Sequence, residues 1–302
     1  EVRIAQVSGD AGGFASRGSL SRLPLAPALA LLRAPPFSTD LRVDGEWELR
    51  LGDTLDGQLR LRRQSGDVRL ADPALDLGLG ALTLELDAAA SRVTARLAAA
   101  SREAGRLQAD GQVVLMREGA GFTLPRSAPL AWAAQLDVPD LRLIRPLLPV
   151  GVRMDARVDA QLEGRGSLAA PRIEGRVAAQ AIRFALPEEG IAIADGSLKL
   201  VLDGDRVRVE EGVLRGQHGR ISLSGEAELR DPQAGLTLNF EKFSVSNRSD
   251  RRVSVSGATR LAVSQKRLRL EGELTAERAR IEMPEAGHPE LSDDVVVVGQ
   301  GP

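Results

Sequence analysis

The feature that most constrains the fold is a strict alternation of apolar and polar residues. The alternation has a period of two, for example over residues 82–86, 107–115, 221–229 and 268–274. Successive side chains of a β-strand point to opposite faces, so this period places the apolar side chains on one face of a sheet. Short turn sequences rich in Gly, Asp and Pro separate the segments, and the pattern predicts about 18 antiparallel strands.

Helical patterns are scarce. Only residues 24–34 and 139–148, each bounded by prolines, fit short helices. A sheet with one apolar face and so little helix must bury that face against itself. We therefore predict an all-β fold: a long, curled antiparallel sheet that forms an elongated, β-taco-like groove with an aliphatic interior, plus two short helices. With strands ~4.8 Å apart, the body would be on the order of 80 Å long.

Other β architectures fit the sequence less well. A membrane-spanning barrel carries girdles of aromatic residues, but aromatics are 3% of the chain and Tyr is absent. A propeller or leucine-rich repeat needs a fixed period of tens of residues, which the sequence lacks. The pattern does not decide whether the curled sheet closes tightly on a dry core or stays open as a groove.

Glycine recurs on the apolar face at the third position of an apolar-x-Gly step. A glycine inside a strand allows a bend or the close approach of another backbone. We expect either ordinary sheet curvature or a sharp bend around an interior at these positions. They are Gly57, Gly164, Gly175, Gly225 and Gly272.

Composition excludes several functions. The chain has 40 basic and 42 acidic residues, so no strong global charge attracts it to nucleic acid. Eight aromatic residues and no Tyr provide no platform for stacking bases. Without Cys, no disulfide, thiol nucleophile or thiolate metal ligand can form. We expect no nucleic-acid partner.

No catalytic motif is recognisable. His218, in a turn-like Gly-Gln-His-Gly segment, and His288 are far apart and have no neighbour at metal-ligand spacing. The segment GRGSLA imitates a dinucleotide-binding loop, but Pro171 follows where a helix would run, so we predict a hairpin. Asp293 and Asp294 are adjacent, and in a strand they would point to opposite faces. We expect a protein that is not an enzyme and has neither cofactor nor metal.

The second half of the chain resembles a known family. The stretches in which the resemblance is found are PDLRLIRPLLP, RVDAQLEGRGSLAAPRIEGRV, GRISLSGEAEL and ARIEMPEAGHPELSDDVVVVG, the last containing Ser292–Val298. From residue 139 onward they are similar to the C-terminal region of the TamB family, the AsmA-like subunits of the translocation and assembly module. We divide the chain into a first β-groove segment, residues 1–138, and a TamB-like segment, residues 139–302.

This resemblance implies a tapered groove in the periplasm of a Gram-negative bacterium. It implies that the groove carries phospholipid between the membranes and works with a TamA-like outer-membrane barrel, bound through a tail beyond residue 302. The chain starts without Met, so we expect a piece of a longer protein that is anchored in the inner membrane. The aliphatic interior alone, without the resemblance, suits acyl chains.

We assign the groove lining to apolar residues of the second half. A competing hypothesis is a scaffold that assembles outer-membrane proteins by adding a client strand to an open sheet edge. Residues 244–252, SVSNRSDRR, look like a charge-protected edge, which counts against it. The lining residues are Val177, Leu198, Leu200, Leu202, Ile221, Leu223, Leu229, Leu236, Leu238, Phe240, Val253, Val255, Leu268, Leu270 and Leu274.

Overall fold

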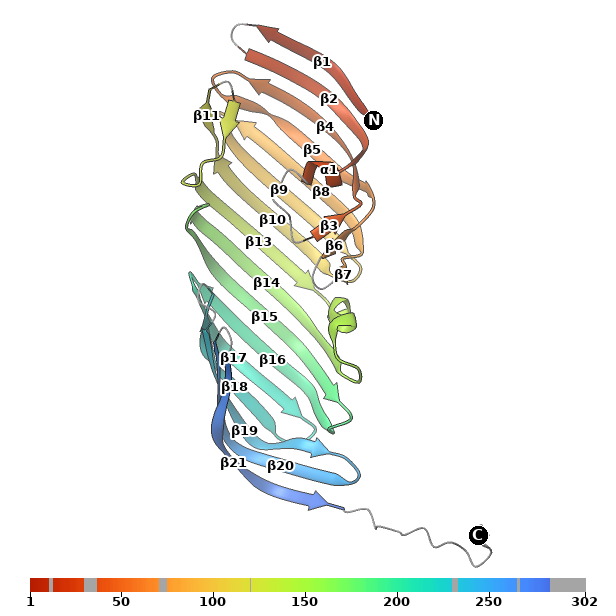
Figure 1. Ribbon diagram of the computed structural model, residues 1–302, viewed down its shortest axis with the longest axis vertical. Helices are drawn as coiled ribbons and strands as arrows, with labels where there is room; N and C mark the ends of the chain where they lie inside the picture. The colour runs from red at the N-terminus through yellow and green to blue at the C-terminus, as the bar shows by residue number, and fades with distance from the viewer. Residues whose placement is uncertain are drawn as a thin grey trace, which may run out of the picture.

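The fold is seen in a computed structural model of the chain. It describes residues 1–10, 13–29, 37–70, 75–119, 121–229, 233–264 and 267–282. Strands account for nearly all of the regular structure, and they build one long, curved body (Figure 1).

Sixteen strands form a single antiparallel sheet whose order follows the chain. The first and last strands are its two edges, so the sheet is not closed into a barrel. The predicted all-β class and the predicted large antiparallel sheet are thereby confirmed. The strands are β1 (Val2–Asp10), β2 (Gly13–Pro24), β4 (Arg42–Leu51), β5 (Leu55–Ser65), β8 (Leu79–Ala89), β9 (Arg92–Ser101), β10 (Gly105–Val114), β13 (Pro129–Val138), β14 (Arg153–Ser167), β15 (Pro171–Leu186), β16 (Ile191–Asp203), β17 (Arg206–Gly216), β18 (Arg220–Glu228), β19 (Gln233–Asn247), β20 (Arg251–Ser264) and β21 (Arg267–Ile281).

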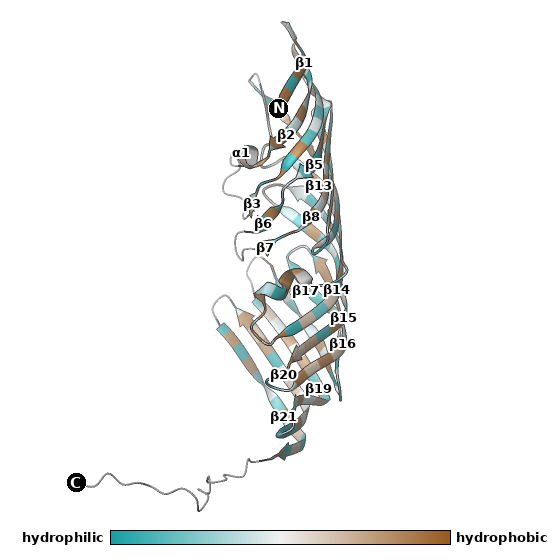
Figure 2. Ribbon diagram, turned by 90° about the vertical axis from the view of Figure 1, so that its right-hand side faces the viewer, coloured by the Kyte–Doolittle hydropathy of each residue, from teal (hydrophilic) through white to brown (hydrophobic). Residues whose placement is uncertain are grey.

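Short elements are inserted into the connections of this meander. The insertions are α1 (Ala26–Leu29), β3 (Phe37–Thr39), β6 (Val68–Leu70), β7 (Leu75–Asp76), β11 (Met116–Glu118), β12 (Gly121–Thr123) and a 3-10 helix, η1 (Arg142–Leu147). Strands β3, β6 and β7 pair into a three-stranded sheet, here called the small sheet. The small sheet, α1 and η1 all lie on one side of the main sheet (Figure 2).

The two predicted short helices are not confirmed as predicted. Over residues 24–34 the structure shows one helical turn, α1, and residues 30–34 lie outside the described part of the chain. Within residues 139–148 the structure has only the 3-10 helix η1, Arg142–Leu147, with hydrogen bonds from Ile144 N to Leu141 O (3.2 Å) and from Leu148 N to Arg145 O (3.2 Å). Pro146 lies inside this segment and has no N–H to donate, which disfavours an α-helix of this length.

The predicted hairpin at GRGSLA is present, because β14 ends at Ser167 and β15 begins at Pro171. The main sheet is continuous across the proposed division at residue 138. β13, which ends there, pairs with β14 along its whole length. The division into two segments therefore does not coincide with a break in the hydrogen-bonded sheet.

Glycine lets neighbouring strands approach closely at the predicted positions. Gly175 has φ 152° and Gly225 has φ 147°, conformations that side chains with a Cβ rarely adopt. A Cβ on Gly225 would lie 2.1 Å from the backbone oxygen of Gly235 on the next strand. Gly164 acts differently, because the indole ring of Trp132 occupies the place of its missing side chain, 2.0 Å from an ideal Cβ. Both roles match the close approach expected from the sequence.

Little of the sheet is deeply buried. The accessible surface is 20746 Å², against about 12,000 Å² for a compact monomer of this mass. Ten apolar residues of the described part of the chain are buried, and Val43, at 1% exposure, is the least accessible of them. The apolar face is thus not packed against a second layer along most of its length.

Candidate functional site

The candidate site is the apolar face of the main sheet, here called the inner face. Pairing registers place one residue from each of twelve successive strands in a single row across this face. Every member of the row is aliphatic or glycine, so no charge or hydrogen-bonding side chain interrupts it. From β8 to β21 the row is Leu82, Ala99, Leu107, Leu136, Ala160, Val177, Leu200, Val209, Gly225, Leu236, Leu261 and Leu270.

Both tryptophans of the chain lie on the inner face of its first half. Trp47 pairs with Gly18 and Leu59, and Trp132 pairs with Gly111 and Gly164. The Trp47 indole Nε1–H donates to Ser16 Oγ at 3.2 Å. Each ring lies over a glycine of the adjacent strand, so this face has room for two bulky rings.

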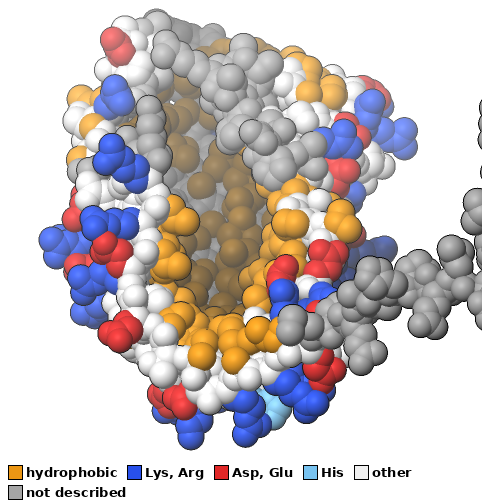
Figure 3. Space-filling model, turned by 60° about the horizontal axis from the view of Figure 1, so that its bottom comes forward, with side chains coloured by type: hydrophobic (Ala, Val, Ile, Leu, Met, Phe, Trp, Pro, Cys, Tyr) orange, Lys and Arg blue, Asp and Glu red, His pale blue; other side chains and the backbone are white. Residues whose placement is uncertain are grey.

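The space-filling view shows a hollow at the C-terminal end of the sheet (Figure 3). Hydrophobic side chains line the hollow, whereas Arg, Lys, Asp and Glu cover the outside of the wall. At one rim, Leu148, Met154, Phe184 and Ile193 help to line a pocket of about 540 Å³ next to η1. This volume is within the roughly 300–1,000 Å³ of small-molecule sites.

The structure brings most of the predicted lining residues together on the inner face. Val177 pairs with Leu200, Ile221 with Phe240, and Leu223 with Leu238. Leu229 is the exception, because β18 ends at Glu228 and Leu229 lies in the turn that follows. The others in strands are Leu198, Leu202, Leu236, Val253, Val255, Leu268, Leu270 and Leu274.

Solvent accessibility varies from strand to strand along the inner face. Ile221, Phe243 and Val255 are buried, and the Phe240 and Phe243 rings pack edge to face with centroids 6.2 Å apart. On β21, by contrast, Leu270 is 64% exposed. The sequence reading missed the buried Phe243. The predicted lining was confined to the second half, whereas the predicted first β-groove segment also contributes inner-face residues from β8 to β13, such as Leu82, Leu107 and Leu136.

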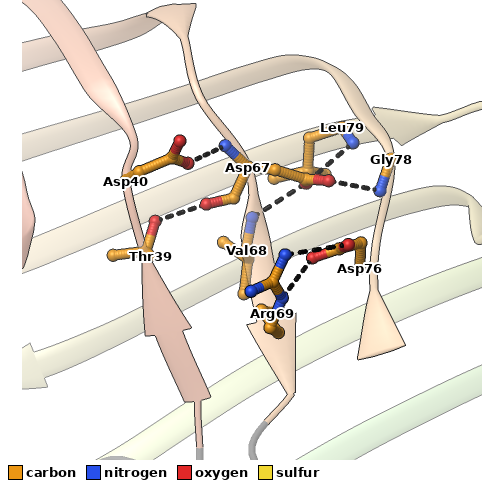
Figure 4. A network of polar contacts seen from close by, with 8 residues as sticks. All are labelled: Thr39, Asp40, Asp67, Val68, Arg69, Asp76, Gly78 and Leu79. Atoms are coloured by element: carbon orange, nitrogen blue, oxygen red, sulfur yellow. Dashed lines mark hydrogen bonds and ion pairs between the residues drawn. The ribbon is translucent and has the colours of Figure 1, made fainter. Parts of the chain in front are cut away.

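The small sheet lies over the inner face in the first half, where Leu41, Val43 and Leu75 are buried. Asp67 organises it (Figure 4). The Asp67 carboxylate accepts the backbone N–H groups of Val68 (2.8 Å), Gly78 (2.8 Å) and Leu79 (3.0 Å). Sequence reasoning gave no sign of this element, whose strands are two or three residues long.

Two more side-chain groups stabilise the small sheet. Asp40 Oδ1 accepts the Asp67 N–H at 2.6 Å, and Thr39 Oγ1 donates to Asp67 O at 2.7 Å. Arg69 on β6 forms a two-pronged ion pair with Asp76 on β7, at 2.6 and 3.1 Å. The Arg69 guanidinium holds the pKa of the Asp76 carboxyl below its usual value.

In the second half of the main sheet, two hairpin tips meet. Ser246 Oγ, next to the β19–β20 turn, donates to Glu189 O in the β15–β16 turn at 2.8 Å, and Arg251 forms an ion pair with Glu189. Residues 244–252 therefore do not form an exposed edge. That prediction is wrong, because β19 and β20 each pair with a strand on both sides, and the sheet edges are β1 and β21.

The described residues contain no cluster of metal-ligating side chains. His218 lies in the turn between β17 and β18, as its Gly-rich context predicted, while His288, Asp293 and Asp294 lie outside the described residues. Several ion pairs lie on the outer face of the main sheet, for example Lys199 with Glu211 at 2.5 Å, which raises the Lys199 pKa. Within the described part of the chain, no helix has the length and apolar character needed to cross a membrane.

The comparisons with known proteins agree with the sequence resemblance. A family model described as the TamB C-terminal domain matches residues 210–302. The predicted resemblance to the C-terminal region of TamB is thereby confirmed over this part of the chain. No curated protein and no solved structure matches the chain.

Proposed function

We propose that this chain, whose residues 210–302 match a family model for the TamB C-terminal domain, carries phospholipid acyl chains along its inner face. The observation that supports this most directly is the uninterrupted apolar row across twelve strands. Acyl chains need dehydration and dispersion contacts rather than directional hydrogen bonds, and such a row supplies both. Because most of the row is only half-buried, its side chains remain available to a ligand.

We also propose the cellular setting that the family suggests. TamB belongs to the translocation and assembly module of the Gram-negative envelope and is associated with TamA. The chain would therefore act in the periplasm, between an inner-membrane anchor and an outer-membrane barrel partner. The hollow of Figure 3 would be the lipid-carrying groove.

Photo-crosslinking in cells tests the proposal. Crosslinking residues replace Leu223, Leu238 or Leu270 on the inner face, and Glu163 or Glu174 on the outer face. We expect phospholipid adducts from the first set and none above background from the second. Equal labelling of the two sets, or no lipid on the inner set, would reject the conduit.

The two tryptophans allow a second test with purified protein. Both lie on the inner face, so nitroxide-labelled phospholipid bound there should quench their fluorescence. Trp47→Phe and Trp132→Phe each leave one reporter, and we expect quenching of both. Quenching by a water-soluble quencher but not by the labelled lipid would show that the face is wetted rather than occupied by lipid.

One observation favours the alternative function, a scaffold for outer-membrane proteins. All residues of β21 are exposed, and its outer edge has no strand partner among the described residues. A client strand could add to this edge by β-augmentation. Crosslinks from β21 to unfolded outer-membrane proteins in preference to phospholipid would favour the scaffold over the conduit.

A further inference from the structure

A second concave surface lies on the opposite, outer face of β17 to β21. It is a basin of about 890 Å³, here called the basic basin, and it is distinct from the hollow in Figure 3. Its lining contains two glutamates, Glu226 and Glu228, and five arginines. The arginines are Arg206, Arg208, Arg260, Arg267 and Arg269.

Most of this positive charge is not neutralised. Arg269 forms an ion pair with Glu271, but the other four arginines have no ion-pair partner among the residues that the structure describes. Several arginines elsewhere on the outer face are ion-paired, such as Arg172 with Asp203 at 2.7 Å and Arg215 with Asp195 at 3.2 Å. The five arginines exceed the two glutamates of the basin by three charges.

Two small residues lie in the middle of the basin. One cross-strand row runs from Arg208 through Glu226, Gly235 and Ala262 to Arg269, so the small pair Gly235 and Ala262 lies between Glu226 and Arg269. A Cβ built on Gly235 meets nothing within 4 Å, which leaves the floor accessible. Arginine forks match phosphate oxygens in pairs, and a shallow floor lets a phosphate approach several of them.

We propose that the basic basin docks the chain onto an anionic phospholipid surface. The basin binds phosphate head groups whose acyl chains remain in the bilayer, because its lining offers no long aliphatic side chain to receive them. This inference depends on the proposed function, which makes a membrane rather than an acidic protein the partner. Surface attraction of about 1 kcal/mol for each arginine corresponds to roughly a fivefold gain in binding per residue.

Vesicle co-sedimentation of the 302-residue protein tests the proposal. The basin variant is Arg208→Gln/Arg260→Gln/Arg267→Gln, and its matched control is Arg96→Gln/Arg172→Gln/Arg215→Gln, three arginines that are already ion-paired. Wild-type protein should bind vesicles rich in phosphatidylglycerol, and binding should weaken at high salt. The basin variant should bind roughly 100-fold less tightly, and the control within about fivefold of wild type.

Three results would overturn the proposal. The first is an equal loss of vesicle binding in the basin variant and the control. The second is equal binding to phosphatidylglycerol and phosphatidylcholine vesicles. The third is binding to polyglutamate but not to vesicles, which would indicate an acidic protein partner. All replaced side chains are exposed, and unchanged circular dichroism would verify the fold. Crosslinking of lipid to the inner face is a separate measurement. If the protein binds vesicles but no lipid is crosslinked to the inner face, the docking proposal stands and the conduit is rejected.

Discussion

At the residue scale, glycine decides how closely the strands can approach one another. Gly225 and Gly235 lie on neighbouring strands, but only Gly225 has a positive φ and a backbone oxygen 2.1 Å from its would-be Cβ. We expect Gly225→Ala to destabilise the protein by about 1–3 kcal/mol, the usual cost of a strained backbone. Gly235→Ala, with open space around it, should change stability by less than about 0.5 kcal/mol. Urea denaturation measures both, and equal effects would contradict this role for Gly225.

Asp67 is the single residue on which the small sheet most depends. Its carboxylate accepts three backbone N–H groups, and hydrogen bonds to a charged group contribute about 1.5–3 kcal/mol each. We expect Asp67→Ala to open the small sheet, and we expect the amides of Val68 and Leu79 to exchange faster. Asp53→Ala serves as the control because Asp53 has a fully exposed side chain. Exchange that is unchanged in Asp67→Ala would show that strand pairing alone holds the element.

At the element scale, the Arg69–Asp76 pair joins β6 to β7. The Asp76 pKa is lowered from its ordinary 3.8, chiefly by the hydrogen bond from Arg69. The pair therefore stabilises the small sheet above about pH 3.8, and this contribution is lost as the pH falls through the lowered value. In carboxyl-detected NMR, Asp76 should titrate below pH 3.8 in the wild type and closer to 3.8 in Arg69→Gln. Identical titration midpoints in the two proteins would contradict the pairing.

The sequence predicted a short helix at the position of η1, but it did not predict that this helix would have 3-10 geometry. Leu148, at its end, lines the rim pocket, whereas Leu147 is 42% exposed. Leu148→Asp should speed amide exchange in the adjacent start of β14, while Leu147→Asp should change it little. If the two variants behave alike, the helix is not packed through Leu148.

How much could be predicted differs between elements for physical reasons. The long strands were predictable because period-two alternation is a local property of a sheet with one apolar face. The small sheet was not, because Asp67 acts through backbone N–H groups up to twelve residues away. The glycines of the apolar-x-Gly steps could be recognised in the sequence. The pairing of Gly164 with Trp132 depends on strand register, which the sequence alone did not supply.

At the scale of the whole molecule, the sixteen-stranded meander dictates an elongated shape. Strand spacing of ~4.8 Å gives a body roughly 70 Å long, although the sheet is curved along its length (Figure 1). A compact protein of 302 residues has a radius of gyration of roughly 19 Å, and an unfolded one roughly 60 Å. We expect small-angle scattering in dilute solution to give a radius of gyration of more than about 22 Å, because a length of 70 Å alone contributes about 20 Å to the radius of gyration. A value near 19 Å would mean that the sheet rolls up in solution, and the inner face would then be a dry core rather than a surface open to lipid.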